Sequence, residues 1–184
     1  MAILEISVYP DAVLKKKAEP INHINDTIRQ LIHDMADTLY SVQGIGLAAP
    51  QVGVSKQLLI YDMERKDLQE GLSDEERLQL RNYNVIINPE IELYDELIVS
   101  ENEGCLSVPD FRSDIQRAKK IHLKAIDENE KPIEIETDEF LAVLLQHEVD
   151  HLNGILFIDY VSALKREMYR RRIMKKRKKN KRKK

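Results

Sequence analysis

Residues 140–152 constrain the fold of this chain more than any other segment. They are almost continuously apolar except for the run Gln146-His147-Glu148-Val149-Asp150-His151. Thr137 or Asp138 can cap the start of a helix here, and Asn153-Gly154 is a typical C-terminal stop. A helix that is apolar around most of its circumference belongs in the centre of a domain. We therefore predict a buried central helix that carries a few polar side chains into the core.

His147 and His151 are four residues apart, so a helix places them on one face, about one turn apart. Such a pair can share a metal ion, and Glu148 between them is placed to take a proton from a water molecule there. Two histidines on a helix more often make ordinary polar contacts. Here the helix is strongly apolar, and burying these side chains without a function costs free energy. We therefore interpret them as part of a metal site.

Two histidines leave this metal site incomplete, because a catalytic site usually has a third protein ligand and an open fourth position. No histidine follows His151, metzincins would have one where Phe157 stands, and the only downstream glutamate is Glu167 in a basic segment. Upstream, the sole thiol, Cys105, lies in Glu103-Gly104-Cys105-Leu106-Ser107, where the glycine lets the backbone bend closely. A thiolate is a strong metal ligand. A lone cysteine can equally be a small buried apolar residue, so both interpretations stay open here.

The other predicted elements follow from the spacing of apolar residues and from residues that typically begin or end helices and strands. Apolar residues recur at helical spacing over 28–42, after Asn25 or Asp26 as cap and before Gly44 as stop. Residues 44–53, rich in Gly, Ala and Pro, predict a tight loop or short extended piece. The remaining predictions are strands at 57–61, 85–88 and 91–99, a charged surface excursion over 64–84 with a short helix near 74–81, and a hairpin of 121–125 with 133–135.

These elements predict an α+β fold. Strands and helices segregate instead of alternating, and the sequence has no internal repeat, so a doubly wound parallel sheet is less favoured. We expect antiparallel sheets packed around the central helix with its His-Glu-x-x-His motif. At 184 residues the chain is long enough for one compact domain and cramped for two.

The charge distribution divides the chain. Residues 165–184 hold 14 of its 29 Lys and Arg and one of its 32 acids, a formal charge of +13, so the rest carries -16 although the whole chain carries only -3. We therefore assign a body at 1–164 and a basic C-terminal helical extension or tail at 165–184. Leu164 and Met168 predict that its start docks for about two turns, until the apolar stripe ends near Arg171. Beyond that, a solvated tail and a phosphate-binding arm are the two alternatives.

Cysteine usage and apolar runs indicate the compartment. The single cysteine excludes an intrachain disulfide, and the first residues lack the basic and apolar regions of a signal peptide. The longest apolar runs are far shorter than the roughly 18 residues of a membrane span. We expect a reduced, cytoplasmic protein with no membrane segment.

Three segments together resemble the signature motifs of the peptide deformylase family, in the same order. The motifs are Gly44-Ile45-Gly46-Leu47-Ala48-Ala49-Pro50-Gln51, Glu103-Gly104-Cys105-Leu106-Ser107 and Gln146-His147-Glu148-Val149-Asp150-His151-Leu152. The resemblance covers about residues 8–161, and no motif position departs from the family pattern. It implies a metal-dependent hydrolase that removes the N-formyl group from the N-terminal formylmethionine of newly synthesised polypeptides and releases formate.

The resemblance also implies a role for each motif residue. Cys105, His147 and His151 would hold the metal, with water in the fourth place. Glu148 would move the proton, while the Gln51 side-chain amide and the Leu106 backbone N–H would donate hydrogen bonds to the oxyanion. The peptide would lie extended beside Ile45, Gly46 and Gly104. An apolar pocket for the methionine side chain would be formed by Ile45, Leu106, Phe140, Val143 and Leu144, with Glu103 and Arg112 near its edge.

The cofactor and partners are likewise expectations from the resemblance. One divalent ion is expected, most often Fe2+ in the cell, with Zn2+, Ni2+ or Co2+ able to substitute. The substrates are N-formylmethionyl nascent peptides. The basic tail suggests contact with ribosomal RNA or protein near the exit tunnel. Arg112 and Arg117 could serve the site or be solvated surface charges.

Two other classes of protein stay open at this point. A general metalloprotease could use the same His-Glu-x-x-His helix, but it would lack its own third ligand. A nucleic-acid-binding protein with a structural metal would fit the tail, yet it needs a closed four-ligand site, and neither a second cysteine nor a nearby fourth ligand is evident.

Overall fold

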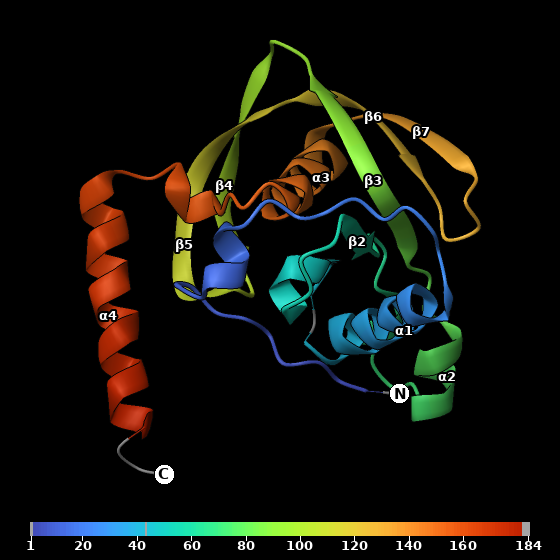
Figure 1. The fold of residues 1–184 in the computed structure, drawn as a ribbon, viewed down its shortest axis with the longest axis horizontal. Coiled ribbons are helices and arrows are strands. Elements are labelled where there is room, and N and C mark those ends of the chain that lie inside the picture. Colours follow the sequence, from blue (N-terminus) through green and yellow to red (C-terminus); the bar gives the residue numbers. More distant parts are fainter. Residues whose placement is uncertain (1, 43, 182–184) are drawn as a thin grey trace.

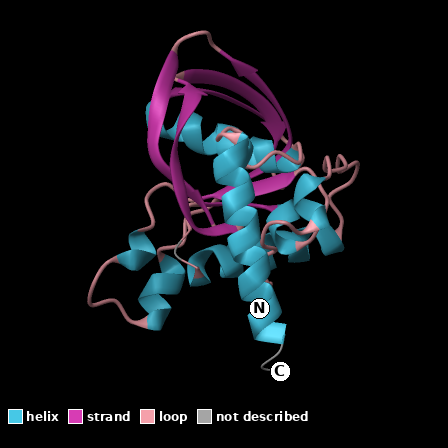
Figure 2. Cartoon of the chain, turned by 90° about the vertical axis from the view of Figure 1, so that its left-hand side faces the viewer, coloured by secondary structure: helices cyan, strands magenta, loops and turns pink. Residues whose placement is uncertain are grey.

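In the computed structural model, which describes residues 2–42 and 44–181, two antiparallel sheets enclose helix α3 (Glu139–Leu152). Figure 1 shows α3 in the centre, with strands crossing around it and the other helices outside. The view from the side shows the strands wrapped about this helix (Figure 2). The predicted α+β class and buried central helix are therefore confirmed.

The larger sheet has five strands in the order β1-β2-β3-β6-β7, and every neighbouring pair is antiparallel. Its strands are β1 (Gly46–Ala48), β2 (Leu58–Tyr61), β3 (Asn84–Leu93), β6 (Lys120–Ile126) and β7 (Pro132–Asp138). The predicted hairpin is confirmed, with Leu123 opposite Ile135 in its register. Ile121 and Leu123 are fully buried, so alternate residues of β6 face α3 and the core.

The second sheet is a long hairpin of β4 (Leu97–Cys105) and β5 (Val108–Ala118). The predicted strand at 91–99 is wrong, because the chain turns between β3 and β4 and both strands extend beyond that range. No strand was predicted for β5. Its residues alternate between more and less exposed positions and include Pro109, so the segment lacks the apolar run by which a strand is usually recognised.

Helix α1 (Asp26–Ser41) agrees with the prediction, and the Asn25 side chain accepts the capping hydrogen bond from Ile28 N at 3.1 Å. The excursion over 64–84 contains the short helices η3 (Lys66–Leu68) and α2 (Asp74–Gln79). It is not surface throughout, since Arg65 and Asp67 are buried. The remaining single-turn helices are η1 (Ala12–Lys15), η2 (Ala49–Val52) and η4 (Phe157–Asp159).

Helix α3 ends as predicted at Asn153-Gly154, and Gly154 has the positive φ of 71° that a helix stop requires. A Cβ atom here would lie 2.8 Å from the backbone carbon of Lys15. Glycine is therefore needed both for its backbone conformation and for the close approach of another segment. At the other end Asp138 occupies the cap position, but its side chain makes no capping hydrogen bond.

The basic segment forms a long helix, α4 (Ala163–Lys181), along one side of the molecule (Figure 1). The predicted docking residues are wrong, because Leu164 and Met168 are 72% and 63% exposed. Tyr169 and Ile173 are buried in their place. Both pairs have the same helical spacing, so the apolar pattern alone does not decide which of them faces the body. Across the described residues, no helix is both long and apolar enough to span a membrane.

Candidate metal and catalytic site

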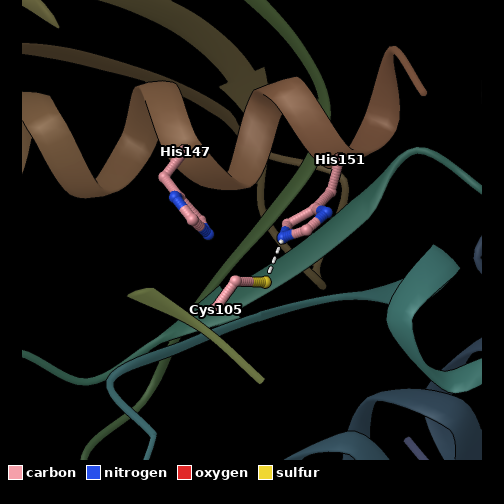
Figure 3. Close-up of side chains that lie close together, drawn as sticks. All are labelled: Cys105, His147 and His151. Atoms are coloured by element: carbon pink, nitrogen blue, oxygen red, sulfur yellow. Dashed lines mark hydrogen bonds between the residues drawn. The ribbon is translucent and has the colours of Figure 1, made fainter. Parts of the chain in front are cut away.

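Three side chains from two elements converge beside the central helix (Figure 3). Cys105 ends β4, while His147 and His151 stand one turn apart on α3. The Sγ atom of Cys105 lies 3.2 Å from Nε2 of His151, and the three potential ligand atoms lie within 4.8 Å of one another. Among the residues that the structure describes, no other group of three or more His, Cys, Asp or Glu does so.

The donor set fits a divalent transition metal. One thiolate and two imidazoles suit iron, zinc, nickel or cobalt, and the closed oxygen shell of a calcium site is not formed here. His147 Nδ1 donates to Glu103 Oε1 at 2.7 Å, which leaves Nε2 for the ion. A ligand histidine commonly donates its other ring N–H to a carboxylate in this way. Although burial lowers the pKa of His147, its hydrogen bonds to Cys105 and Glu103 raise this pKa well above its ordinary value. The surroundings of this ring thus favour positive charge.

Glu103 belongs to a buried ionic network behind His147. Its two carboxylate oxygens accept from Arg117 at 2.6 and 3.2 Å, and Arg117 also donates to Asp150 at 2.6 Å. Burial raises the pKa of Glu103, but hydrogen bonds from His147 and Arg117 outweigh burial and hold it at about 2. The Tyr160 ring covers the Arg117 guanidinium at 4.9 Å. The carboxylate is therefore ionised and oriented.

This network bears on two expectations. Glu103 was expected near the edge of the methionine pocket; it does line the cleft, and its carboxylate contacts His147 and Arg117. Arg117 was open to interpretation as a solvated surface charge, yet its side chain is only 3% exposed. Asp150, inside the histidine motif, was assigned no role. The missed signal was that a buried helix carries this second carboxylate, which requires a buried cation as its partner.

Glu148 lies beside the ligand cluster and against β1. It is 3% exposed, and its Oε2 atom has no hydrogen-bond partner among the described residues. A Cβ atom on Gly46 would lie 2.5 Å from Glu148 Oε1, so only glycine allows the carboxylate to occupy this position. Burial raises the pKa of Glu148 to about 7, although His147 opposes the shift. A carboxyl group with such a pKa can both accept and release a proton near neutral pH.

Gln51 and Leu106 flank the same site. Gln51 Oε1 accepts from Ala48 N at 2.8 Å, which fixes the amide so that Nε2 faces Cys105 Sγ and Ser107 Oγ, each at 3.4 Å. Leu106 follows the thiol at the turn between β4 and β5. The Gln51 amide N–H is thus held beside Cys105, and Leu106 lines the same cleft.

A cleft of about 740 Å³ opens onto these groups. Every site residue expected from the sequence lines it except His151, which is 1% exposed behind the cluster. The expected lining residues are Ile45, Gly46, Gln51, Gly104, Cys105, Leu106, Phe140, Val143, Leu144, His147 and Glu148, together with Glu103 and Arg112. Arg112 donates to Asn102 O at 3.1 Å and packs against Gly104. Val108–Phe111 of β5 also line the cleft and were missed with that strand.

The sequence matches a known family model over most of its length. The model described as Polypeptide deformylase matches residues 3–167. A peptide deformylase of Thermodesulfovibrio yellowstonii is 49% identical over 94% of this chain and 97% of the relative. One of Desulfosudis oleivorans is 44% identical over 95% of each.

Solved structures agree with the sequence matches. A peptide deformylase from Legionella pneumophila superposes with a TM-score of 0.82 and 41% identity, covering 98% of this chain and 99% of the other. One from Ehrlichia chaffeensis, in complex with actinonin, gives 0.83 and 36%, covering 96% and 98%. The likeness therefore extends across the sheets, the central helix and nearly the whole chain.

Proposed function

The chain belongs to the peptide deformylase family and removes the N-formyl group from nascent peptides, and we propose that it does so with a divalent metal held by Cys105, His147 and His151. The observation that carries this proposal is the convergence of their ligand atoms within 4.8 Å, beside a buried carboxylate at the bottom of a cleft. The products are formate and a peptide with a free N-terminal amine.

We propose Fe2+ as the ion used in the cell, with Zn2+, Ni2+ or Co2+ able to substitute. The mixed sulfur and nitrogen donors suit each of these ions. When bound, the ion supplies Lewis acidity for hydrolysis of the formyl amide. Metal analysis of protein purified without oxygen tests the assignment. Iron at about one equivalent is the expected result, and zinc alone would contradict it.

Glu148 is the proposed proton carrier. Its buried carboxylate would accept a proton from the attacking water and return it to the departing amine nitrogen, which makes it base and then acid. The oxyanion formed at the formyl carbon needs donors already in place. The Gln51 side-chain amide, fixed by its bond from Ala48 N, and the Leu106 backbone N–H are the proposed donors.

The cleft supports an extended peptide. We propose that the substrate backbone pairs with Ile45, Gly46 and Gly104, as an added strand would. Main-chain pairing tolerates varied side chains, which suits an enzyme that acts on many nascent chains. The methionine side chain would enter the apolar part of the cleft at Val143 and Leu144, which are 7% and 6% exposed.

Formate release separates this function from its alternatives. Anaerobically prepared protein is expected to release formate from formyl-Met-Ala-Ser, and Glu148→Ala should lose at least about 100-fold in kcat while retaining its metal. Glu75→Ala, an exposed glutamate on α2, is the matched control and should behave as wild type. A protease would cleave an internal peptide bond instead. Substantial formate release by Glu148→Ala would contradict the mechanism.

We propose that α4 is the docking element of the basic extension 165–184, appended to a catalytic domain at 1–164, and that it contacts the ribosome. Lys165, Lys175, Lys178 and Lys179 are cations of α4 that make no ion pair with another residue in the described part of the chain. They remain available to phosphates. A site at the ribosome also implies a cytoplasmic location, where nascent chains emerge.

Co-sedimentation with ribosomes tests this docking. Replacing Lys175, Lys178 and Lys179 by serine should abolish salt-sensitive binding. The matched control replaces Lys16, Lys17 and Lys131 on the body by serine and should leave binding intact. Unchanged binding after deletion of residues 175–184 would refute the assignment.

A further inference from the structure

Arg65 is a buried cation in the charged excursion that follows β2. Its side chain is 4% exposed, and its backbone is in the left-handed region with φ 41°. The guanidinium makes a bidentate ion pair with the Asp67 carboxylate, at 2.8 Å from Nε and 2.9 Å from Nη2. Buried ion pairs contribute little net stability on their own, because desolvation offsets their attraction. The position of this pair therefore calls for another explanation.

The remaining guanidinium nitrogen, Nη1, contacts the cleft wall on the side that faces away from the cleft. Arg65 Nη1 donates to the Gly44 carbonyl oxygen, and Nη2 lies 3.5 Å from the Tyr40 carbonyl oxygen at the end of α1. The guanidinium also stacks on the Tyr40 ring at 4.9 Å. Gly44 lines the cleft, whereas Arg65 does not. Arg65 thus ties the cleft wall to α1 without reaching the substrate space.

A neighbouring residue holds the next carbonyl in the same way. Asp62 N donates to Ile45 O at 2.9 Å, and Asp62 Oδ1 accepts from Arg65 N at 3.1 Å. Two successive carbonyl groups of the wall are therefore anchored by the segment that begins the excursion. The wall needs such support, because Gly44 and Gly46 have more backbone freedom to lose than other residues.

We propose that Arg65 is a positioning residue for the peptide substrate, which it serves by fixing the Gly44 carbonyl and with it the Ile45–Gly46 edge. The proposal rests on the proposed function, in which the substrate backbone pairs with this edge. Arg65 holds the edge in its binding geometry before substrate arrives, so less ordering is required on binding. Its loss is expected to weaken peptide binding while leaving Glu148 and the ligand cluster unchanged.

Steady-state kinetics on formyl-Met-Ala-Ser with the metal-loaded protein tests this role. Arg65→Lys and Arg65→Met are expected to raise KM about 10-fold, the loss typical of one charge-assisted hydrogen bond, with kcat within about 2-fold of wild type. Asp67→Asn keeps the shape of the partner and one acceptor. If the Arg65 variants do not fold, Asp67→Asn provides a second test of the same contact, and it should raise KM by a smaller factor.

Arg81→Met is the matched control. Arg81 stacks on the same Tyr40 ring at 4.6 Å and pairs with Asp37 at 2.7 Å, but it makes no hydrogen bond to Gly44. This variant is expected to lose less thermal stability than Arg65→Met, because its ion pair is more exposed, and to keep KM within about 2-fold, because it leaves the cleft wall anchored.

The outcomes separate the inference from the function on which it rests. If folded Arg65 variants and Asp67→Asn keep the wild-type KM, or if Arg81→Met raises KM as much as they do, Arg65 has only a structural role and the inference is wrong. A fall in kcat with unchanged KM would also overturn it. Failure of the wild-type protein to release formate would instead refute the proposed function.

Discussion

Replacing Glu103 with glutamine is expected to weaken both the fold and the metal site. The glutamine keeps the shape and can still accept one hydrogen bond, but the negative charge is lost. Arg117, only 3% exposed, then retains Asp150 as its one carboxylate partner. Breaking a buried ion pair on one side costs about 3–5 kcal/mol. Because the glutamine amide keeps part of the contact, we expect the free energy of unfolding to fall by about 3 kcal/mol, at the lower end of this range.

The same substitution removes the carboxylate that orients His147. The bond from His147 Nδ1 to Glu103 Oε1 is 2.7 Å long, and loss of such a partner typically lowers metal affinity about 10–100-fold. Urea unfolding of metal-depleted protein measures the first effect. The rate at which a coloured chelator removes the metal measures the second.

Glu101→Gln is the control for this experiment. Glu101 lies two residues earlier on the same strand and is exposed, so its replacement should change neither quantity. If Glu103→Gln unfolds at the wild-type urea concentration and releases metal at the wild-type rate, the network does not orient His147, and our interpretation of Glu103, Arg117 and Asp150 is incorrect.

Three further outcomes are expected. Gly46→Ala should lower kcat about 100-fold with fold and metal intact, because its Cβ would displace the Glu148 carboxylate, 2.5 Å away; near-normal kcat would be inconsistent with that contact. Gly154→Ala should lower the free energy of unfolding in urea by about 1–3 kcal/mol, because a φ of 71° is strained for a residue that has a Cβ atom. Protection of α4 amides from hydrogen exchange, measured relative to the intrinsic exchange rate at each pH, should fall below about pH 4. Arg177 holds the pKa of Asp11 below its ordinary value of 3.8, so their contact stabilises docking above that value and is lost as pH falls through the lowered pKa. Asp11→Asn should show a smaller step, because Asp110 pairs with Lys176 of α4 and its pKa is lowered in the same way.

Local patterns predicted the elements whose structure depends on neighbours in sequence. Helix α1 and helix α3 follow from apolar spacing with caps and stops, and the β6–β7 hairpin follows from alternation across a short turn. In each case the residues that define the element lie within a few turns or one hairpin of each other. The pattern in the sequence therefore carries most of the information needed.

The β4–β5 hairpin could not be predicted in the same way. β5 forms one wall of the cleft and presents charged residues along its length, so it shows no apolar run, and Pro109 adds a break. Its partner β4 was merged with β3 because the two apolar stretches are separated by only a few residues. The docked face of α4 likewise depended on Tyr169 and Ile173 meeting the body.

The sequence by itself determined which residues are proposed for the chemistry of the site. The helical period puts His147 and His151 on one face with Glu148 beside them, and the three motifs indicated Cys105 as the remaining ligand. The tertiary structure decided how that chemistry is supported: Glu103 and Arg117 lie behind His147, and Arg65 lies behind the cleft wall. The physical reason is that bonding along the chain sets distances within a helical turn, whereas contacts between distant elements arise only when the sheets pack around α3.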